Sequence, residues 1–139
     1  MTPELEALGL RAVACKAWRW MPGMLVAVEH VMDGRTVPFM ERLVEDCGEG
    51  FEGPSWSDGE APRFTGAWVS WEQPEDESWT VLPDLTDPAT IGCLLALVRE
   101  AYGEWPVVVY IEPFGVNVGR HYDGETLGEA LVLALEAAP

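Results

Sequence analysis

Apolar residues recur at helical spacing in three parts of the chain, which predicts helices over 3–18, 88–102 and 126–137. The second of these begins most clearly. Asp87 is a favoured N-cap residue, and Pro88 is a favoured first helical residue. Three helical segments of this length provide three apolar faces that other parts of the chain must cover.

The predicted central helix is apolar on two sides. Its expected core face holds residues at helical spacing: Ile91, Leu94, Leu95, Val98 and Tyr102. The other side carries Cys93, Ala96 and Leu97, which are not polar either. Such a helix needs a cover on both sides. We expect the second cover to come from the rest of the chain or from a homodimer.

Strand-like runs separate the predicted helices. Residues 25–32 and 35–40 predict a hairpin, because Asp33 and Gly34 form a strong two-residue turn signal between them. Pro38 has no N–H to donate to a neighbouring strand, so the second strand of this hairpin is expected at a sheet edge.

Three further runs predict strands over 64–71, 107–111 and 116–122. Residues 107–111 are five consecutive β-formers, a pattern typical of a buried central strand. The run from Glu112 to Gly115 predicts the turn that leads to its partner strand.

Together these elements predict an α+β protein with a mixed or mainly antiparallel sheet of four to five strands, packed with about three helices. The length of 139 residues fits a single domain over 1–139. The expected core consists of inward-facing apolar residues of the helices and strands: Ile91, Leu95, Val98, Val107, Val109, Ile111, Leu131 and Leu135.

Acidic residues outnumber basic ones by 24 to 8, which gives a formal net charge of −16. Such a charge repels nucleic acid and anionic membrane surfaces, so neither is an expected partner. It favours a basic protein partner, although a surplus of acids also serves as an ordinary solvated surface.

The chain shows no sign of export or of a membrane span. Glu4 and Glu6 stand where a signal peptide needs positive charge, and the longest apolar run, Ile91–Val98, is too short to cross a bilayer. Three widely separated cysteines indicate no disulfide framework. We therefore expect a cytoplasmic protein.

Charge is most uneven in an acidic, loop-rich excursion at about 41–80. Residues 41–77 hold eleven acids and two bases. Long loops without regular structure are often functional. Acids there can steer a basic partner while aromatic side chains supply buried contact area. The candidate partner-binding residues are therefore Glu45, Asp46, Glu49, Phe51, Glu52, Trp56, Asp58 and Glu60. The alternative is a solvated insertion without a partner.

No catalytic or metal motif stands out. The two histidines lack a serine or cysteine with a local catalytic signature, and no cysteine or histidine pairs have zinc-site spacing. The glycines at 48, 50 and 53 have the spacing of a dinucleotide loop, but the surrounding acids would repel phosphate and no helix follows. We expect a protein that is not an enzyme and that uses no cofactor or metal.

Three stretches of the sequence resemble small uncharacterised proteins of bacteriophages and prophages. They are Ala17-Trp18-Arg19-Trp20-Met21-Pro22-Gly23-Met24, Leu82-Pro83-Asp84-Leu85-Thr86-Asp87-Pro88-Ala89-Thr90 and Gly128-Glu129-Ala130-Leu131-Val132-Leu133-Ala134-Leu135-Glu136-Ala137. The arrangement is similar to the phage ABA-sandwich type of domain, which implies helices on both faces of a sheet. The resemblance covers about the first 25 residues and residues 82–139, and it does not extend to 41–80. It implies a viral or prophage gene expressed in a bacterial cytoplasm, and no catalytic residues.

Three functions of different classes follow from these observations. The first is a phage accessory protein that binds a host protein, as a host-defence inhibitor presenting carboxylates where a basic groove expects nucleic-acid phosphates. The second is a protein that binds or sequesters a small molecule such as a nucleotide or sugar, using tryptophans and a pocket between helix and sheet. The third is a structural or assembly protein of the phage.

Overall fold

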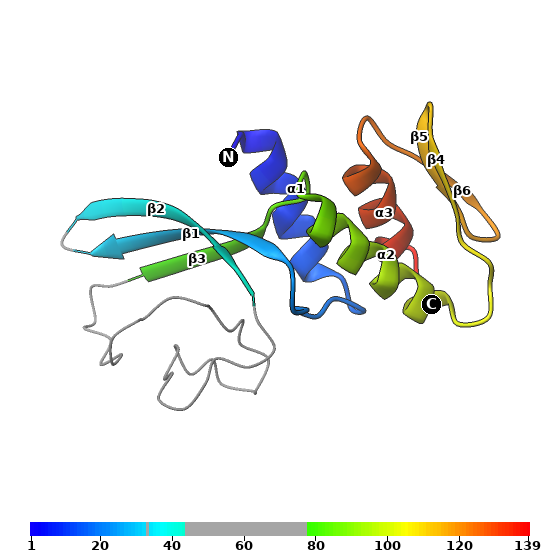
Figure 1. The fold of residues 1–139 in the computed structure, drawn as a ribbon, viewed down its shortest axis with the longest axis horizontal. Coiled ribbons are helices and arrows are strands. Elements are labelled where there is room, and N and C mark those ends of the chain that lie inside the picture. Colours follow the sequence, from blue (N-terminus) through cyan, green and yellow to red (C-terminus); the bar gives the residue numbers. More distant parts are fainter. Residues whose placement is uncertain (33, 44–77) are drawn as a thin grey trace. The chain divides into compact units, whose positions relative to one another are not determined.

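The computed structural model describes residues 1–32, 34–43 and 78–139. These residues form three helices and six strands, and the strands make two three-stranded antiparallel sheets (Figure 1). The predicted α+β class is confirmed. The expectation of one sheet with helices on its faces is wrong, because among the described residues β1, β2 and β3 pair only with one another, and β4, β5 and β6 likewise. The predicted strand over 64–71 lies outside the described residues.

The chain forms two compact units, which are described separately. One unit comprises Met1–Arg19 and Leu85–Pro139, and the other comprises Trp20–Asp84. The first is called the helical unit below and the second the hairpin unit. That the 139 residues behave as one cooperative domain stays a prediction.

The hairpin unit contains strands β1 (Leu25–Met32), β2 (Arg35–Arg42) and β3 (Ser78–Pro83), in the order β2-β1-β3. The predicted hairpin is confirmed, with Gly34 in the left-handed region at φ 70°. β2 lies at the edge of the sheet, as Pro38 predicted. β3 was not predicted from the sequence. It pairs with β1 over six residues.

The helical unit contains α1 (Pro3–Ala14), α2 (Pro88–Tyr102) and α3 (Leu127–Glu136). Each helix begins at an N-cap whose side-chain oxygen accepts a backbone N–H three residues on. The bonds are Thr2 to Leu5 at 3.3 Å, Asp87 to Thr90 at 2.8 Å and Thr126 to Glu129 at 3.1 Å. α1 ends four residues before the predicted boundary, and the bounds of α2 match the prediction.

The second sheet consists of β4 (Val108–Ile111), β5 (Phe114–Asn117) and β6 (His121–Asp123), in the order β4-β5-β6. One strand was predicted over 116–122. Instead the chain reverses there, with Gly119 at φ 71° and the Val118 N–H donating to the Arg120 oxygen at 2.9 Å. Because of this tight turn, three short strands form a local antiparallel sheet of their own, and none of them pairs with β1, β2 or β3.

α3 is the centre of the helical unit. It contacts α1 and α2 as well as β5 and β6, and Figure 1 shows the sheet at the side of α3 away from α1. Its fully or almost fully buried side chains point in several directions around the helix: Ala130, Leu131, Val132, Ala134 and Leu135. A helix that is apolar all round must be enclosed, and here helices and sheet share that task.

The core prediction for the strands and helices is only partly confirmed. Val98, Leu131 and Leu135 are buried, but Ile111 is 67 % exposed because β4 lies at the open edge of its sheet. On α2 the buried face is rotated from the predicted one. Leu97 is 1 % exposed, whereas Leu95 is only half-buried.

The remaining members of the predicted core are intermediate in burial. Ile91, Val107 and Val109 are each half-buried. Cys93 and Ala96, on the side of α2 that was expected to need a second covering element, are half-buried. Since Leu97 is buried within a single chain, a homodimer is not required to cover it. Homodimer formation stays a prediction.

Polar contacts complete the packing around α3. The Tyr102 hydroxyl donates to the Ala134 carbonyl oxygen at 2.8 Å, in the last turn of α3, where carbonyls lack helical partners. Burial is the main cause that raises the pKa of Tyr102, and its hydrogen bond with Tyr122 adds to the effect. Gly128 is also required, because a Cβ there would lie 2.7 Å from the Leu85 carbonyl oxygen.

No helix among the described residues is long and apolar enough to cross a membrane.

The rotated face of α2 predicts unequal effects of two neighbouring substitutions. Leu94→Ala empties a site that is 0 % exposed and should lower the free energy of unfolding by about 2–5 kcal/mol. Leu95→Ala removes a half-buried side chain, so its effect should be clearly smaller. Urea denaturation followed by tryptophan fluorescence measures both. Equal losses would show that both leucines are core residues.

A two-point ion pair between α1 and α3 predicts a pH dependence. Arg11 Nε and Nη2 donate to Glu136 Oε1 and Oε2 at 2.9 and 2.8 Å. The hydrogen bond from Arg11 is the main cause that lowers the pKa of Glu136. A carboxyl group with a lowered folded-state pKa stabilises the fold above its unfolded pKa, about 4.3, and stops doing so as the pH falls through the lower folded-state value.

Glu136→Gln should therefore destabilise the protein at pH 7, and its difference from the parent should shrink as the pH falls below about 4.3 and through the lowered folded-state pKa of Glu136. The side chains of Arg11 and Glu136 are 41 % and 35 % exposed, so solvent screening limits the loss at pH 7 to about 1 kcal/mol or less. Urea titrations between pH 3 and 7 measure the gap, with the exposed Glu112→Gln as control. A gap that stays constant from pH 7 down to pH 3 would contradict the assignment.

Candidate functional site

Most of the large apolar side chains that remain exposed in the helical unit gather on one short segment, the exceptions being Met1 and Leu10. Five of them lie between residues 105 and 114, and they are 38–67 % exposed: Trp105, Val108, Tyr110, Ile111 and Phe114. Soluble proteins rarely leave such a group of large apolar residues uncovered without a use for it. The segment comprises the approach to β4, β4 itself and the first residue of β5.

The strand pairing shows which of these side chains share a face. Val108 is paired with Asn117 and Asn117 with His121, while Tyr110 is paired with Gly115. Directly paired residues point to the same side of a sheet. Gly115 is in turn paired with Asp123, so Val108, Tyr110, His121 and Asp123 lie on the same face. We call it the outer face, because the opposite face carries the buried Val116.

His121 lies over Gly115 at the centre of the outer face. A Cβ at Gly115 would be 2.9 Å from His121 Cε1 and 3.0 Å from its Nε2, so the glycine makes room for the imidazole. Nε2 of His121 lies 2.7 Å from Asp123 Oδ1. The Tyr110 ring meets the imidazole edge-on, with 5.5 Å between the ring centroids. The outer face therefore carries Tyr110 from β4 and His121 and Asp123 from β6, with the imidazole lying over Gly115 of the central strand β5.

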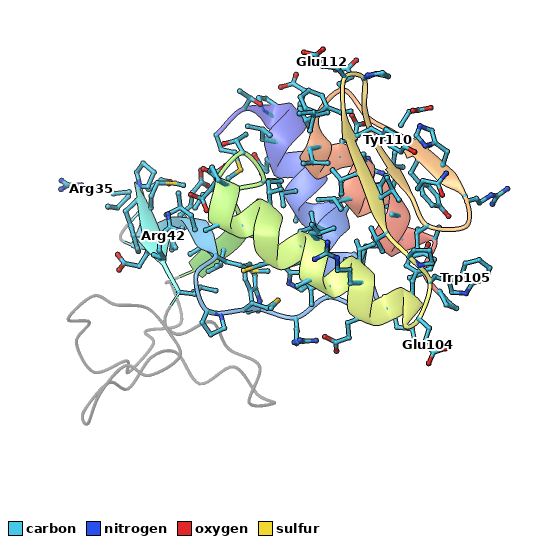
Figure 2. The ribbon with its side chains drawn as sticks, turned by 45° about the vertical axis from the view of Figure 1, so that its right-hand side comes forward. Arg35, Arg42, Glu104, Trp105, Tyr110 and Glu112 are labelled. Atoms are coloured by element: carbon cyan, nitrogen blue, oxygen red, sulfur yellow. The ribbon has the colours of Figure 1, made fainter. Side chains whose placement is uncertain are left out.

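Trp105 extends this surface at the other end of β4. Its indole packs on the β5–β6 turn, since a Cβ at Gly119 would be 3.3 Å from the ring carbons Cε3 and Cζ3. The backbone N–H of Trp105 donates to the backbone carbonyl oxygen of Tyr102 at 3.3 Å, which fixes the chain as it leaves α2. The indole is nevertheless 63 % exposed. Figure 2 shows Trp105 near the start of β4 and Tyr110 nearer the hairpin end.

Acidic side chains surround the apolar residues. Residues 104–125 hold four carboxylates, at Glu104, Glu112, Asp123 and Glu125, against the single guanidinium of Arg120. All four acidic residues are exposed. Figure 2 shows Glu112 at the hairpin end of β4 and Glu104 in the turn that follows α2, before β4 begins. The arrangement suits a partner with an apolar contact area and basic residues around it.

The candidate binding residues of the acidic excursion lie outside the described residues. This holds for the whole set: Glu45, Asp46, Glu49, Phe51, Glu52, Trp56, Asp58 and Glu60. Their role in binding a partner stays a prediction. Of the oxygen-rich pairs considered for metals, Asp87 is the N-cap of α2. Within the described part of the chain, no group of three or more His, Cys, Asp or Glu side chains could hold a metal ion.

Sequence reasoning missed the outer face because it placed residues 107–111 in a buried central strand. The signal that contradicts this placement is the pair of prolines, Pro106 and Pro113, that bracket the run. Prolines at both ends of a short strand favour an edge position. The exposure of Trp105 has a similar signal, since Gly103 and Pro106 enclose it in a turn.

No family model, no curated protein and no solved structure matches this chain. The similarity to phage and prophage proteins thus rests on the residues quoted above and stays a prediction.

Proposed function

We propose that this protein is a phage accessory protein, not an enzyme, that acts by binding a basic host protein through the outer face of the sheet β4–β5–β6 and the adjoining Trp105. The observation that carries the proposal is the group of five large apolar residues, 38–67 % exposed, on a ten-residue segment. Val108 and Tyr110 lie on the outer face and Trp105 adjoins it, while Ile111 and Phe114 are exposed at the hairpin end of the opposite face. Uncovered groups of this kind on soluble proteins mark interaction sites.

The residue types fit a protein contact. Trp and Tyr are the side chains most enriched at the energetic centres of interfaces, and here Trp105 and Tyr110 are 63 % and 45 % exposed. Each side chain is packed against the sheet, Trp105 on the turn at Gly119 and Tyr110 on the imidazole of His121. Aromatic side chains that are already positioned lose little conformational freedom when a partner covers them.

The charge of the chain supports a basic partner. A net charge of −16 speeds the approach of a basic protein and suppresses contacts with acidic ones. Host enzymes that act on nucleic acid carry basic grooves for phosphates, and carboxylates such as Glu104 and Glu112 can occupy such grooves. On this proposal the protein inhibits a host-defence factor in the bacterial cytoplasm.

Two truncations test the contact surface. Tyr110→Ala and Trp105→Ala should each weaken binding to a host protein captured from bacterial lysate by about tenfold or more, since contacts of this type are worth about 2 kcal/mol. Leu10→Ala is the matched control, because Leu10 is 53 % exposed on α1 and away from the sheet. Calorimetry or surface plasmon resonance measures the affinities. Parent-like binding by both sheet variants would place the contact elsewhere.

The acidic excursion has its own test on the same partner. Neutralising Glu45, Asp46, Glu49 and Glu52 to Gln or Asn should lower the association rate and its salt sensitivity. Trp56→Ala should raise the dissociation rate, since an aromatic contact is lost. Stopped-flow kinetics at several salt concentrations measures both rates. If both variants behave like the parent, the excursion is not part of the binding surface.

A further inference from the structure

β4 leaves one edge of its sheet open. Among the described residues it pairs with β5 alone, and it stands first in the order β4-β5-β6. Val108, Tyr110 and Ile111 are 46 %, 45 % and 67 % exposed, so the strand is accessible on both faces as well as along its edge. An open strand edge presents backbone donors and acceptors to any extended chain that approaches it.

The hydrogen-bond pattern identifies which backbone groups point outward. The Gly124 N–H donates to the Phe114 oxygen at 3.2 Å, so the backbone groups of Phe114 face β6. Backbone groups alternate sides along a strand, which turns those of Gly115 toward β4. Its pairing partner Tyr110 therefore bonds with β5, and the N–H and C=O of the neighbouring Val109 point away from β5.

The edge lacks the features that discourage strand addition elsewhere in this protein. β2, an edge of the other sheet, carries Pro38 within the strand and Arg35 and Arg42 at its ends. β6, the other edge of the same sheet, carries the ionisable pair His121 and Asp123. β4 consists of Val, Val, Tyr and Ile, with no charge and no proline within it. Proteins usually protect such an edge with charge, proline or a covering element.

We propose that the free edge of β4 takes up an extended, basic segment of the partner protein as a fourth strand. The backbone of Val109 supplies main-chain hydrogen bonds, while Val108 and Tyr110 on one face and Ile111 on the other contact alternate side chains of the added strand. Glu112 directly follows β4, and Glu104 lies in the turn between α2 and β4, before the start of the strand (Figure 2). Both carboxylates can attract lysine or arginine residues that flank the added strand.

Charge argues against a second copy of this chain as the occupant. Antiparallel pairing of two β4 edges around a twofold axis brings Glu104 of each copy toward Glu112 of the other, and each copy carries a net charge of −16. A basic segment turns the same carboxylates into favourable contacts. This inference rests on the proposed function and specifies how the partner is recognised at the same surface.

The direct test uses a seven-residue synthetic peptide that alternates lysine with valine. Amide-resolved NMR of the full chain should show chemical-shift changes along β4, and hydrogen exchange at the Val109 N–H should slow by tenfold or more at saturating peptide. The Tyr110 N–H, which bonds with β5, is protected already and serves as the internal reference. A peptide with proline at every second position, or with glutamate in place of lysine, should bind at least tenfold more weakly.

Several results overturn the inference. Unchanged exchange at Val109 under saturating peptide, or no shift changes at all, shows that the edge is not used. Equal binding of the glutamate peptide removes the charge argument. Exchange at Val109 that slows with protein concentration alone identifies a second copy as the occupant.

Val109→Pro separates this inference from the proposed function. It removes the outward N–H, whereas the bonds between β4 and β5 involve Val108 and Tyr110, and an edge strand tolerates proline at such a position. The variant should lose the peptide and weaken binding of the captured host protein. If Val109→Pro folds and binds that protein normally while Tyr110→Ala does not, strand addition is wrong, but the outer face remains the contact surface of the proposed function. If Tyr110→Ala and Trp105→Ala also bind normally, the proposed function at this surface fails.

Discussion

The helical unit depends on the enclosure of α3. Its side chains from Ala130 to Leu135 are almost all apolar and buried, so water must be excluded from nearly its whole circumference. Two helices cannot enclose it alone, and the short sheet supplies the remaining wall through β5 and β6. The polar contacts with α3 involve its C-terminal part: Tyr102 bonds with the Ala134 carbonyl oxygen, and Arg11 holds the Glu136 carboxylate. Burial thus provides the stability, and these bonds determine how the neighbouring elements are placed.

The same constraint explains why an apolar surface is left exposed. A three-stranded sheet can pack only one of its two faces against α3. Val116 and Tyr122 are paired on this inner face. The other face has no helix in this unit to cover it, and β4 reaches beyond β6 so that Ile111 at the hairpin end is open to solvent. The exposure of Tyr110 and Ile111 is thus a consequence of using so small a sheet as a wall. On the proposed function, the partner covers the part of the sheet that the core does not use.

Local signals predicted most of the fold, and long-range pairing did not follow from them. The N-caps Thr2, Asp87 and Thr126, and the turn at Gly34, are complete within a few residues, so helix starts and the first hairpin were correct. The split into two sheets depends on which strands meet, and nothing within residues 107–111 distinguishes a buried strand from an exposed one. On α2, apolar residues lie on both sides of the helix, so the sequence did not show which side faces the core. The prediction chose Leu95, whereas Leu97 is the buried residue. The candidate site was missed for the same reason, since its residues are defined by their exposure.

On the proposed mode of action, the negative charge of the chain explains how the edge of β4 can stay open without pairing with a second copy. An uncharged strand edge is a hazard for most soluble proteins, because copies of the same chain can pair along it. In a chain with a net charge of −16, mutual repulsion opposes that pairing at long range, while the carboxylates of Glu104 and Glu112, before and after β4, oppose it at contact. Only a basic segment gains from both the charges and the free backbone groups of Val109. The acidic surplus then acts as the selective element, because it excludes the most abundant wrong partner, the protein itself, and leaves main-chain pairing to supply the affinity.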